Sequence, residues 1–143
     1  MFFGRMSDEM VRAMVETLPG EVTVIDANDE VVAWNQHETR IFKRPMSCMG
    51  INFRQCHPEC SLAAVEEIVA EMRSGAKDKS SFWIDLELEP GAPKHKILIE
   101  FFALRNEKGE YLGCMEFAQD VEEIRHLEGQ KRLLDGPAAP GAH

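Results

Sequence analysis

Residues 21–35 read EVTVIDANDEVVAWN, and this stretch decides how the chain begins to fold. Two short β-rich runs, 21–27 and 31–35, flank a polar break that contains Asn28 and Asp29. Asparagine and aspartate tolerate the backbone angles of tight turns, whereas β-branched residues favour strands. The stretch therefore predicts a β-hairpin at the start of a sheet.

A short helix is predicted just before this hairpin, over residues 7–18. Its apolar residues recur at helical spacing: Met10, Val11, Met14, Val15 and Leu18. Ser7 is placed to cap the first turn, because a serine oxygen accepts hydrogen bonds from free backbone N–H groups there. Pro19 and Gly20 then end the helix.

A longer amphipathic helix is predicted over residues 61–73, after a stretch from 36 to 60 in which no period persists. Its apolar stripe consists of five residues: Leu62, Val65, Ile68, Val69 and Met72. A helix of about 14 residues is roughly 21 Å long. Gly75 is a natural stop, because glycine readily adopts the left-handed conformation that ends helices.

Three alternating segments follow this helix, and each predicts a strand: 80–88, 95–104 and 111–119. The turn sequences EPGAP and NEKGE separate them. Together with the hairpin they predict an α+β fold, a five-stranded antiparallel sheet with the long helix across its concave inner face. A weaker amphipathic stripe predicts a C-terminal flanking helix over 121–135, and GPAAPGAH at 136–143 predicts a disordered tail.

The composition narrows the classes of partner. Sixteen Lys and Arg against 25 Asp and Glu give a net charge of −9, which argues against nucleic-acid binding through phosphates. No run approaches the roughly 20 apolar residues of a membrane helix, and the first residues are charged too early for a signal peptide. We therefore expect a cytoplasmic chain of one domain, whose four cysteines are free thiols.

This order of elements resembles a PAS domain over about residues 16–129. The likeness lies in the opening IDANDEVVAWN, in Gly50 followed by HPE before the long helix, and in the closing RNEKGEYLGCMEFAQDVEEIRHLEG. The resemblance implies a PAS domain at 21–120 between flanking helices at 1–20 and 121–135. It also implies a sensory or interaction role rather than catalysis.

More narrowly, the chain resembles a divergent bacterial PAS variant that follows hemerythrin-like domains in a family of undefined function. Its segment Gln55-Cys56-His57-Pro58, the Ser61-led helix, Phe82-Trp83-Ile84 and the closing residues 123–135 correspond to that pattern. PAS folds hold haem, flavin, small acids or nothing, so the resemblance leaves the ligand open.

The segment CHPEC at residues 56–60 allows several interpretations. Pro58 and Glu59 suit the first turn of a helix, with Ser61 as a cap if the helix begins later, and the cysteines would then be buried fillers. A zinc or iron–sulfur site would need four convergent ligands, which this spacing does not supply. A catalytic Cys–His pair is also disfavoured, because adjacent residues of an extended segment point to opposite sides.

A cofactor is the remaining interpretation of this segment. Haem could be held by His57, although the ligand histidine of haem-binding PAS domains usually lies within the long helix, which has none here. The stretch GINFR resembles the flavin site of light sensors with this fold, but Phe53 stands where their reactive cysteine would be.

The function predicted from the sequence is a PAS sensor that binds a small molecule in an apolar pocket. The predicted polar groups are His57, Asn52 and Asn35, and the predicted walls are Phe53, Trp34 and Ile68. The terminal helices would carry the signal to a partner protein, and the chain would form a homodimer without nucleic-acid or membrane contacts. A haem sensor using His57, a metal or redox protein and a ligand-free dimerisation module are the alternatives.

Overall fold

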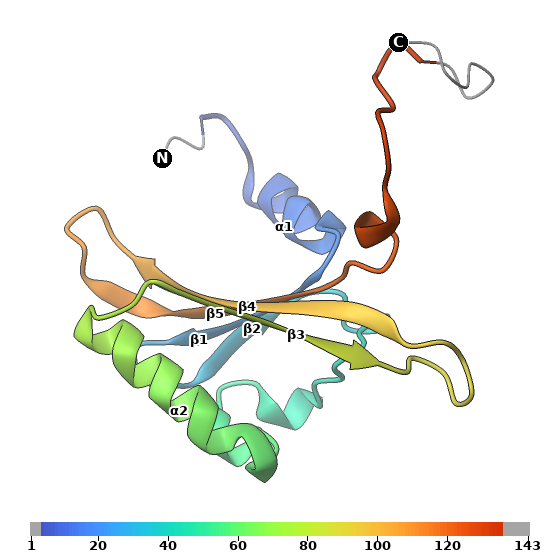
Figure 1. Cartoon of the computed structure of the whole chain (residues 1–143). Coiled ribbons are helices and arrows are strands. Elements are labelled where there is room, and N and C mark those ends of the chain that lie inside the picture. Colours follow the sequence, from blue (N-terminus) through green and yellow to red (C-terminus); the bar gives the residue numbers. More distant parts are fainter. Residues whose placement is uncertain (1–3, 136–143) are drawn as a thin grey trace.

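The computed structural model describes residues 4–135, so the predicted tail at 136–143 lies outside the described part. A five-stranded antiparallel sheet with the strand order β2-β1-β5-β4-β3 forms the body of the molecule (Figure 1). The strands are β1 Glu21–Asp26, β2 Val31–Trp34, β3 Lys79–Leu86, β4 His95–Arg105 and β5 Tyr111–Asp120. The predicted fold class is therefore confirmed. Within residues 4–135 no helix has the length and apolar character to cross a membrane.

The predicted hairpin is formed by β1 and β2, with Asp29 at a positive φ of 64° in the turn. The carboxylate of Asp26 accepts hydrogen bonds from the backbone N–H groups of Asn28 at 2.9 Å and Glu30 at 3.1 Å. These bonds hold the turn locally, as expected for an aspartate that precedes a tight turn.

The central strand β5 joins the two halves of the chain. It pairs with β1 on one side and with β4 on the other, all antiparallel. In this register Glu116 lies opposite Thr23 of β1 and Phe101 of β4. Side chains from distant parts of the sequence therefore meet on one face of the sheet, called the inner face here.

The long helix α2, Glu59–Ser74, covers this inner face, as predicted (Figure 1). Val65, Val69 and Met72 are its buried residues, and they belong to one core cluster with the strand residues Ile97 and Ile99. The helix ends at a left-handed Gly75 with φ 84°, which confirms the predicted stop. Ser61 lies inside the helix rather than at its cap, because the helix begins two residues earlier, directly after Pro58.

The first helix α1, Asp8–Thr17, lies on the opposite side of the sheet from α2 (Figure 1). Ser7 caps it as predicted, accepting a hydrogen bond from the Met10 N–H at 3.1 Å. All ten helical residues keep at least part of their surface exposed. Packing among residues 4–135 therefore covers Val11 and Val15 of the apolar stripe only in part and leaves Met10 and Met14 exposed.

Asn35 ties α1 to the sheet from a fully buried position at the end of β2. Its side-chain carbonyl accepts the N–H of Val22 at 2.6 Å. Its amide donates to the carbonyl oxygens of Val15 at 2.9 Å and Gly20 at 3.0 Å. All of these partners are backbone groups at the junction of α1 and β1, so Asn35 serves the fold.

The predicted C-terminal helix is wrong. Within the described residues, 121–135 contain a single short turn of 3-10 helix, η3 Ile124–His126. Leu127, Leu133 and Leu134 are 78%, 100% and 95% exposed, so this part of the amphipathic stripe packs against nothing among residues 4–135. An isolated helix of this length is marginal in water, and Gly129 weakens it further.

The Asn35 bonds predict a clear loss of stability on truncation. Asn35→Ala leaves two buried backbone groups, the Val22 N–H and the Gly20 carbonyl, without this partner, and each such group costs about 1–3 kcal/mol. We expect the free energy of unfolding, measured with urea, to fall by at least that amount. The matched control is Asn28→Ala in the exposed turn, which should change it by less than about 0.5 kcal/mol. Equal effects of the two substitutions would contradict this role of Asn35.

Candidate functional site

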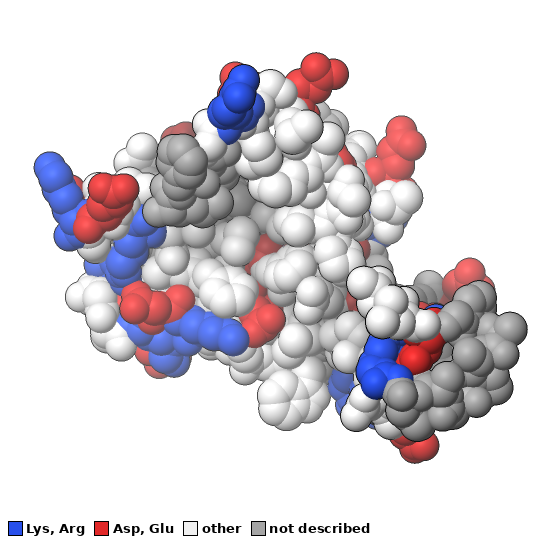
Figure 2. Space-filling view, turned by 90° about the horizontal axis from the view of Figure 1, so that it is seen from above, with Lys and Arg blue, Asp and Glu red and all other residues white. Residues whose placement is uncertain are grey.

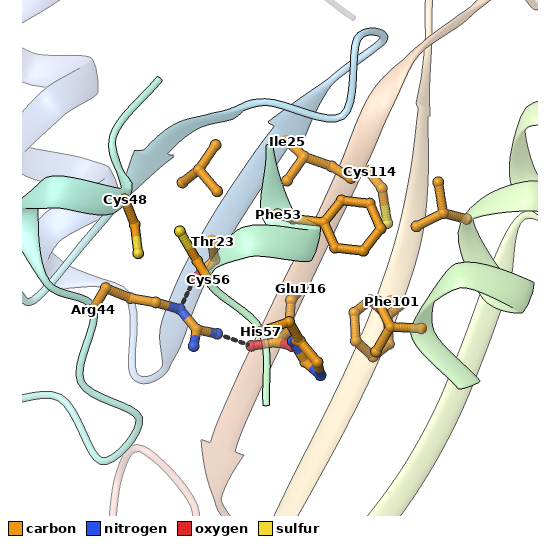
Figure 3. A pocket seen from close by; sticks show the side chains of 13 residues that line it. Thr23, Ile25, Arg44, Cys48, Phe53, Cys56, His57, Phe101, Cys114 and Glu116 are labelled. Atoms are coloured by element: carbon orange, nitrogen blue, oxygen red, sulfur yellow. Dashed lines mark hydrogen bonds and ion pairs between the residues drawn. The ribbon is translucent and has the colours of Figure 1, made fainter. Parts of the chain in front are cut away.

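A cavity of about 60 Å³ lies between the inner face of the sheet, α2 and the segment from Arg44 to His57 (Figure 3). Six of its thirteen lining residues have hydrocarbon side chains: Ile25, Val31, Phe53, Val65, Val69 and Phe101. One water molecule needs about 10–15 Å³ of such space, so the cavity has room for several waters or a small molecule.

The segment over the cavity is held by backbone bonds to the hairpin. Gly50 donates to the carbonyl of Val31 at 2.7 Å, and Val31 donates to the carbonyl of Ile51 at 2.9 Å. The short 3-10 helix η2, Phe53–Gln55, follows, and the Phe53 N–H donates to the carbonyl of Asp29 at 2.9 Å. Phe53 is thereby pressed into the cavity wall, where it is 6% exposed.

An ion pair forms the polar end of the cavity. Arg44 Nη2 lies 2.9 Å from Glu116 Oε1, and Arg44 Nε lies 3.4 Å from the Thr23 hydroxyl (Figure 3). The Arg44 and Glu116 side chains are only 20% and 14% exposed. A charged pair at this depth is costly to desolvate, and replacement of such a pair by apolar residues is often neutral or stabilising. A contribution to folding stability therefore does not by itself explain why Arg44 and Glu116 are buried here.

A second ion pair lies next to the first, because Arg40 and Arg44 both donate to the Thr23 hydroxyl. Arg40 and Glu21 have side chains that are 0% and 5% exposed, and their charged atoms are 3.7 Å apart. Arg40 also donates to the carbonyl oxygens of Val22 at 3.1 Å and Asn35 at 3.0 Å, and to the Thr23 hydroxyl at 2.9 Å. The two arginines and two glutamates balance one another in charge.

Burial shifts the titration of the groups at this end. It raises the pKa of Glu116 above the ordinary carboxyl value, while the positive charges of Arg44 and Arg40 oppose the shift. It also lowers the pKa of His57, with a smaller contribution from Arg44, so the imidazole is neutral at neutral pH. The ring nitrogen Nε2 of His57 lies 2.8 Å from the Ser61 hydroxyl oxygen, which orients the ring.

Three cysteines line the cavity, and all four cysteines of the chain are free. Burial and a contact with the Cys48 thiol raise the pKa of Cys56 to about 11, and burial raises the pKa of Cys114 to about 12. Because the thiolate is the nucleophile and the metal ligand, neither group is activated at neutral pH. Within residues 4–135, no three His, Cys, Asp or Glu side chains form a metal-binding group.

Two of the six predicted site residues, His57 and Phe53, line the cavity. Asn52 instead caps η2, accepting the N–H of Arg54 at 3.0 Å, and Asn35 binds the backbone as described above. The other two predicted walls lie outside the lining set. Trp34 stacks on His37 with ring centroids 6.1 Å apart, and Ile68 packs at the edge of the core beside the lining residues of α2.

Arg44 and Glu116 were missed by the sequence reasoning. Glu116 did leave a signal, because strand alternation places it on the same face as Cys114 and Ala118, where a charged residue is unexpected. Arg44 left none, because it belongs to an irregular segment without periodicity.

A haem or a flavin would need far more room than this cavity provides. Pockets for drug-sized ligands measure roughly 300–1,000 Å³, and these cofactors are at least that large. The cavity here measures about 60 Å³, and His57 Nε2 is engaged with Ser61. The residues present do not fit either cofactor.

The raised pKa of Glu116 predicts the sign of a pH effect. In the pH range between the ordinary carboxyl pKa of about 4.3 and the raised value, the folded state binds more protons than the unfolded chain. The contribution of Glu116 to the free energy of unfolding therefore falls as pH rises through this range. We expect the unfolding free energy of the wild type minus that of Glu116→Gln to decrease as the pH rises from about 4.3 through the raised pKa of Glu116. Urea titrations at each pH measure it.

Glu128→Gln, at an exposed position, is the control for the substitution itself. A difference between the wild type and Glu116→Gln that grew with pH would mean that the arginines outweigh burial and lower the pKa of Glu116.

Comparisons with known proteins agree with this architecture. The sequence model of the PAS domain family matches residues 11–122, whereas no curated protein matches the chain. Among solved structures, a C-terminal domain from Streptococcus mutans is similar, with 27% sequence identity and a TM-score of 0.79. The alignment covers 90% of this chain and 96% of that one.

Two more distant structures share the fold. The PAS domain of BvgS from Bordetella pertussis has 13% identity and a TM-score of 0.58, over 82% of this chain and 90% of that one. VqmA from Vibrio cholerae, in a complex with ligand and DNA, has 18% identity and a TM-score of 0.58, over 90% of this chain and 63% of that one. The family match spans most of the sequence and agrees with the observed sheet and helices, so this chain belongs to the PAS domain family.

Proposed function

We propose that this chain is a non-catalytic, cytoplasmic PAS sensor that binds a small molecule in the cavity beneath α2. The observation that carries the proposal is the polar end of an otherwise apolar cavity, formed by Arg44 and Glu116 at 2.9 Å. Small-molecule sites are mostly apolar with a few placed polar groups. A structure of VqmA is described as bound to DPO, so a ligand in this fold has a precedent among the similar structures.

The size of the cavity limits the ligand. About 60 Å³ is well below the roughly 300–1,000 Å³ of drug-sized sites, so a ligand of only a few heavy atoms matches it. Phe53 and Phe101 supply flat apolar walls, and Val65 and Val69 of α2 supply the facing wall. A ligand here would touch both the sheet and the helix, so it can favour one packing of α2 over another.

The signal has a short route out of the cavity. Glu116 belongs to β5, and the same strand continues to Asp120 and directly into the segment at 121–135. The Val121 N–H donates to the carbonyl of Lys96, so the start of this segment is tied to β4. This segment is largely irregular. The ligand-dependent signal would therefore reach a partner protein through this irregular segment and through α1, and not through a C-terminal helix.

The outer face of the sheet supports a homodimer. Trp83 is 65% exposed there, and Met10 and Met14 of α1 are 57% and 43% exposed. Viewed from the α1 side, uncharged residues predominate (Figure 2). A second copy of the chain, related by a two-fold axis, would cover the same apolar patch on both copies. This face also supports the second candidate function, a dimerisation module without a ligand.

If the cavity binds a small molecule, the purified protein should carry a bound ligand, and a variant with a filled cavity should not. Native mass spectrometry of freshly purified wild-type protein should show a bound mass that denaturation releases. Val65→Phe fills the cavity and should abolish the adduct, at a stability cost of about 1–3 kcal/mol. Val32→Phe, at an exposed position of β2, is the matched control and should retain it. Wild-type protein that carries no adduct, even after incubation with cell extract, would favour the ligand-free module.

If the chain forms this dimer, its apparent mass should increase with protein concentration, and substitution of Trp83 should abolish that increase. Trp83→Glu places a charge in the centre of the contact, and loss of such an anchor costs about 2 kcal/mol or more, roughly 30-fold in affinity. Analytical ultracentrifugation should show dimers of the wild type and monomers of the variant at the same concentration. Leu133→Glu, fully exposed and away from the sheet, should remain dimeric. A monomeric wild type would rule out this interface.

A further inference from the structure

We propose, resting on the function proposed above, that the ligand of this cavity is an uncharged molecule with an amide-type group. Its N–H would donate to the Glu116 carboxylate, and its carbonyl oxygen would accept from the Arg44 guanidinium. A small apolar substituent would fill the rest of the cavity. Two independent observations carry this assignment: the balance of charge around the cavity and the unused hydrogen-bonding capacity of the ion pair.

The charge balance argues against an ionic ligand. The four charged groups at this end, Arg40, Arg44, Glu21 and Glu116, form two pairs with a net charge of zero. Thr23 carries no charge, and His57 and the thiols of Cys56 and Cys114, which also line the cavity, are uncharged at neutral pH. An ionic ligand would therefore add an uncompensated charge to a buried site, which is expensive unless a counter-charge is free.

The hydrogen-bonding capacity of the pair is only partly used. A carboxylate offers about four acceptor sites and a guanidinium offers five N–H donors. Within residues 4–135, the one donor to the Glu116 carboxylate is Arg44. Arg44 itself uses only two of its nitrogen atoms, toward Glu116 and Thr23. Both residues line the cavity, so free acceptors and free donors lie side by side at its polar end (Figure 3).

An amide matches this arrangement because it presents a donor and an acceptor that are also side by side. A carboxylate ligand would offer Arg44 an acceptor but would repel Glu116, and an ammonium ligand would do the reverse. The amide alone among these three groups completes both partners without changing the net charge. Hydrogen bonds to charged groups are stronger than those between neutral groups, so two such bonds would select the amide over either ion.

The apolar side chains that line the cavity limit the shape and size of the apolar part of the ligand. Ile25, Phe53 and Phe101 face Val65 and Val69 across the cavity, and these side chains suit a short branched hydrocarbon. With about 60 Å³ available, four to six heavy atoms is about the limit if each needs roughly the space of one water. Isobutyramide, with six heavy atoms, is therefore a suitable probe, and isobutyrate and isobutylamine are its charged matches.

The experiment titrates these three compounds into the full-length, isotope-labelled chain at neutral pH and follows backbone amide resonances. We expect isobutyramide to shift Thr23, Cys114 and Glu116, with an affinity about tenfold or more above that of either ion. Tighter binding of isobutyrate or isobutylamine to the wild type would overturn the uncharged class. It would leave the proposed function intact, because a small molecule would still occupy the cavity.

Charge-altered variants sharpen the test. Glu116→Gln leaves one unpaired positive charge, so the preference should move from isobutyramide to isobutyrate. Arg44→Gln leaves one unpaired negative charge, so it should move to isobutylamine. Glu128→Gln, exposed and remote, should keep the wild-type order. A preference that stayed the same in both cavity variants would overturn the role of the ion pair.

The absence of any response to all three compounds would also overturn the proposal, because the amide probe would then fail to engage the pair. The proposed function is judged separately, by the native adduct that purified protein carries and that Val65→Phe removes. If the cavity variants do not fold, which a thermal unfolding scan detects, the order of the three probes on the wild type decides the outcome.

Discussion

The burial of the inner face of the sheet against α2 is the contact on which the rest of the structure depends. Met72 and Ile97 are fully buried and Val69 nearly so, and burying a side chain of this kind contributes about 1.5–3 kcal/mol. A single helix cannot cover the whole face of a five-stranded sheet. Over β1 and β2 the inner face is covered by the irregular segment that contains η1, Met46–Cys48, and η2. The cavity lies where this segment meets α2.

The polar groups of the site follow from the same change of cover. A helix packed closely on a sheet excludes charge, whereas the irregular segment brings Arg40 and Arg44 under the sheet and pairs them with Glu21 and Glu116. These four groups balance in charge, so they can remain buried without a counter-ion. The result is an apolar cavity that ends in an ion pair with a net charge of zero, and this ion pair is the basis of the proposal that the ligand is uncharged.

The candidate site was only partly predictable from the sequence. His57 and Phe53 were found because they flank the start of the long helix, which periodicity located well. Asn52 and Asn35 were assigned to the pocket as polar residues near its rim, but both bind backbone groups instead. A buried asparagine is as well suited to satisfying a backbone junction as to binding a ligand, and composition cannot distinguish the two roles.

Local patterns by themselves determined the hairpin, both α-helices, the three later strands and their antiparallel pairing, because period, caps and turn residues act over only a few positions. Two features were decided only by tertiary structure. The pairing of β1 with β5 joins residues almost a hundred positions apart, and it alone brings Thr23 beside Glu116. The segment 121–135 has an amphipathic stripe, but most of this stripe packs against nothing among residues 4–135, so its periodicity did not become a helix. A pattern supplies the apolar face, and only a packed neighbour makes that face stable.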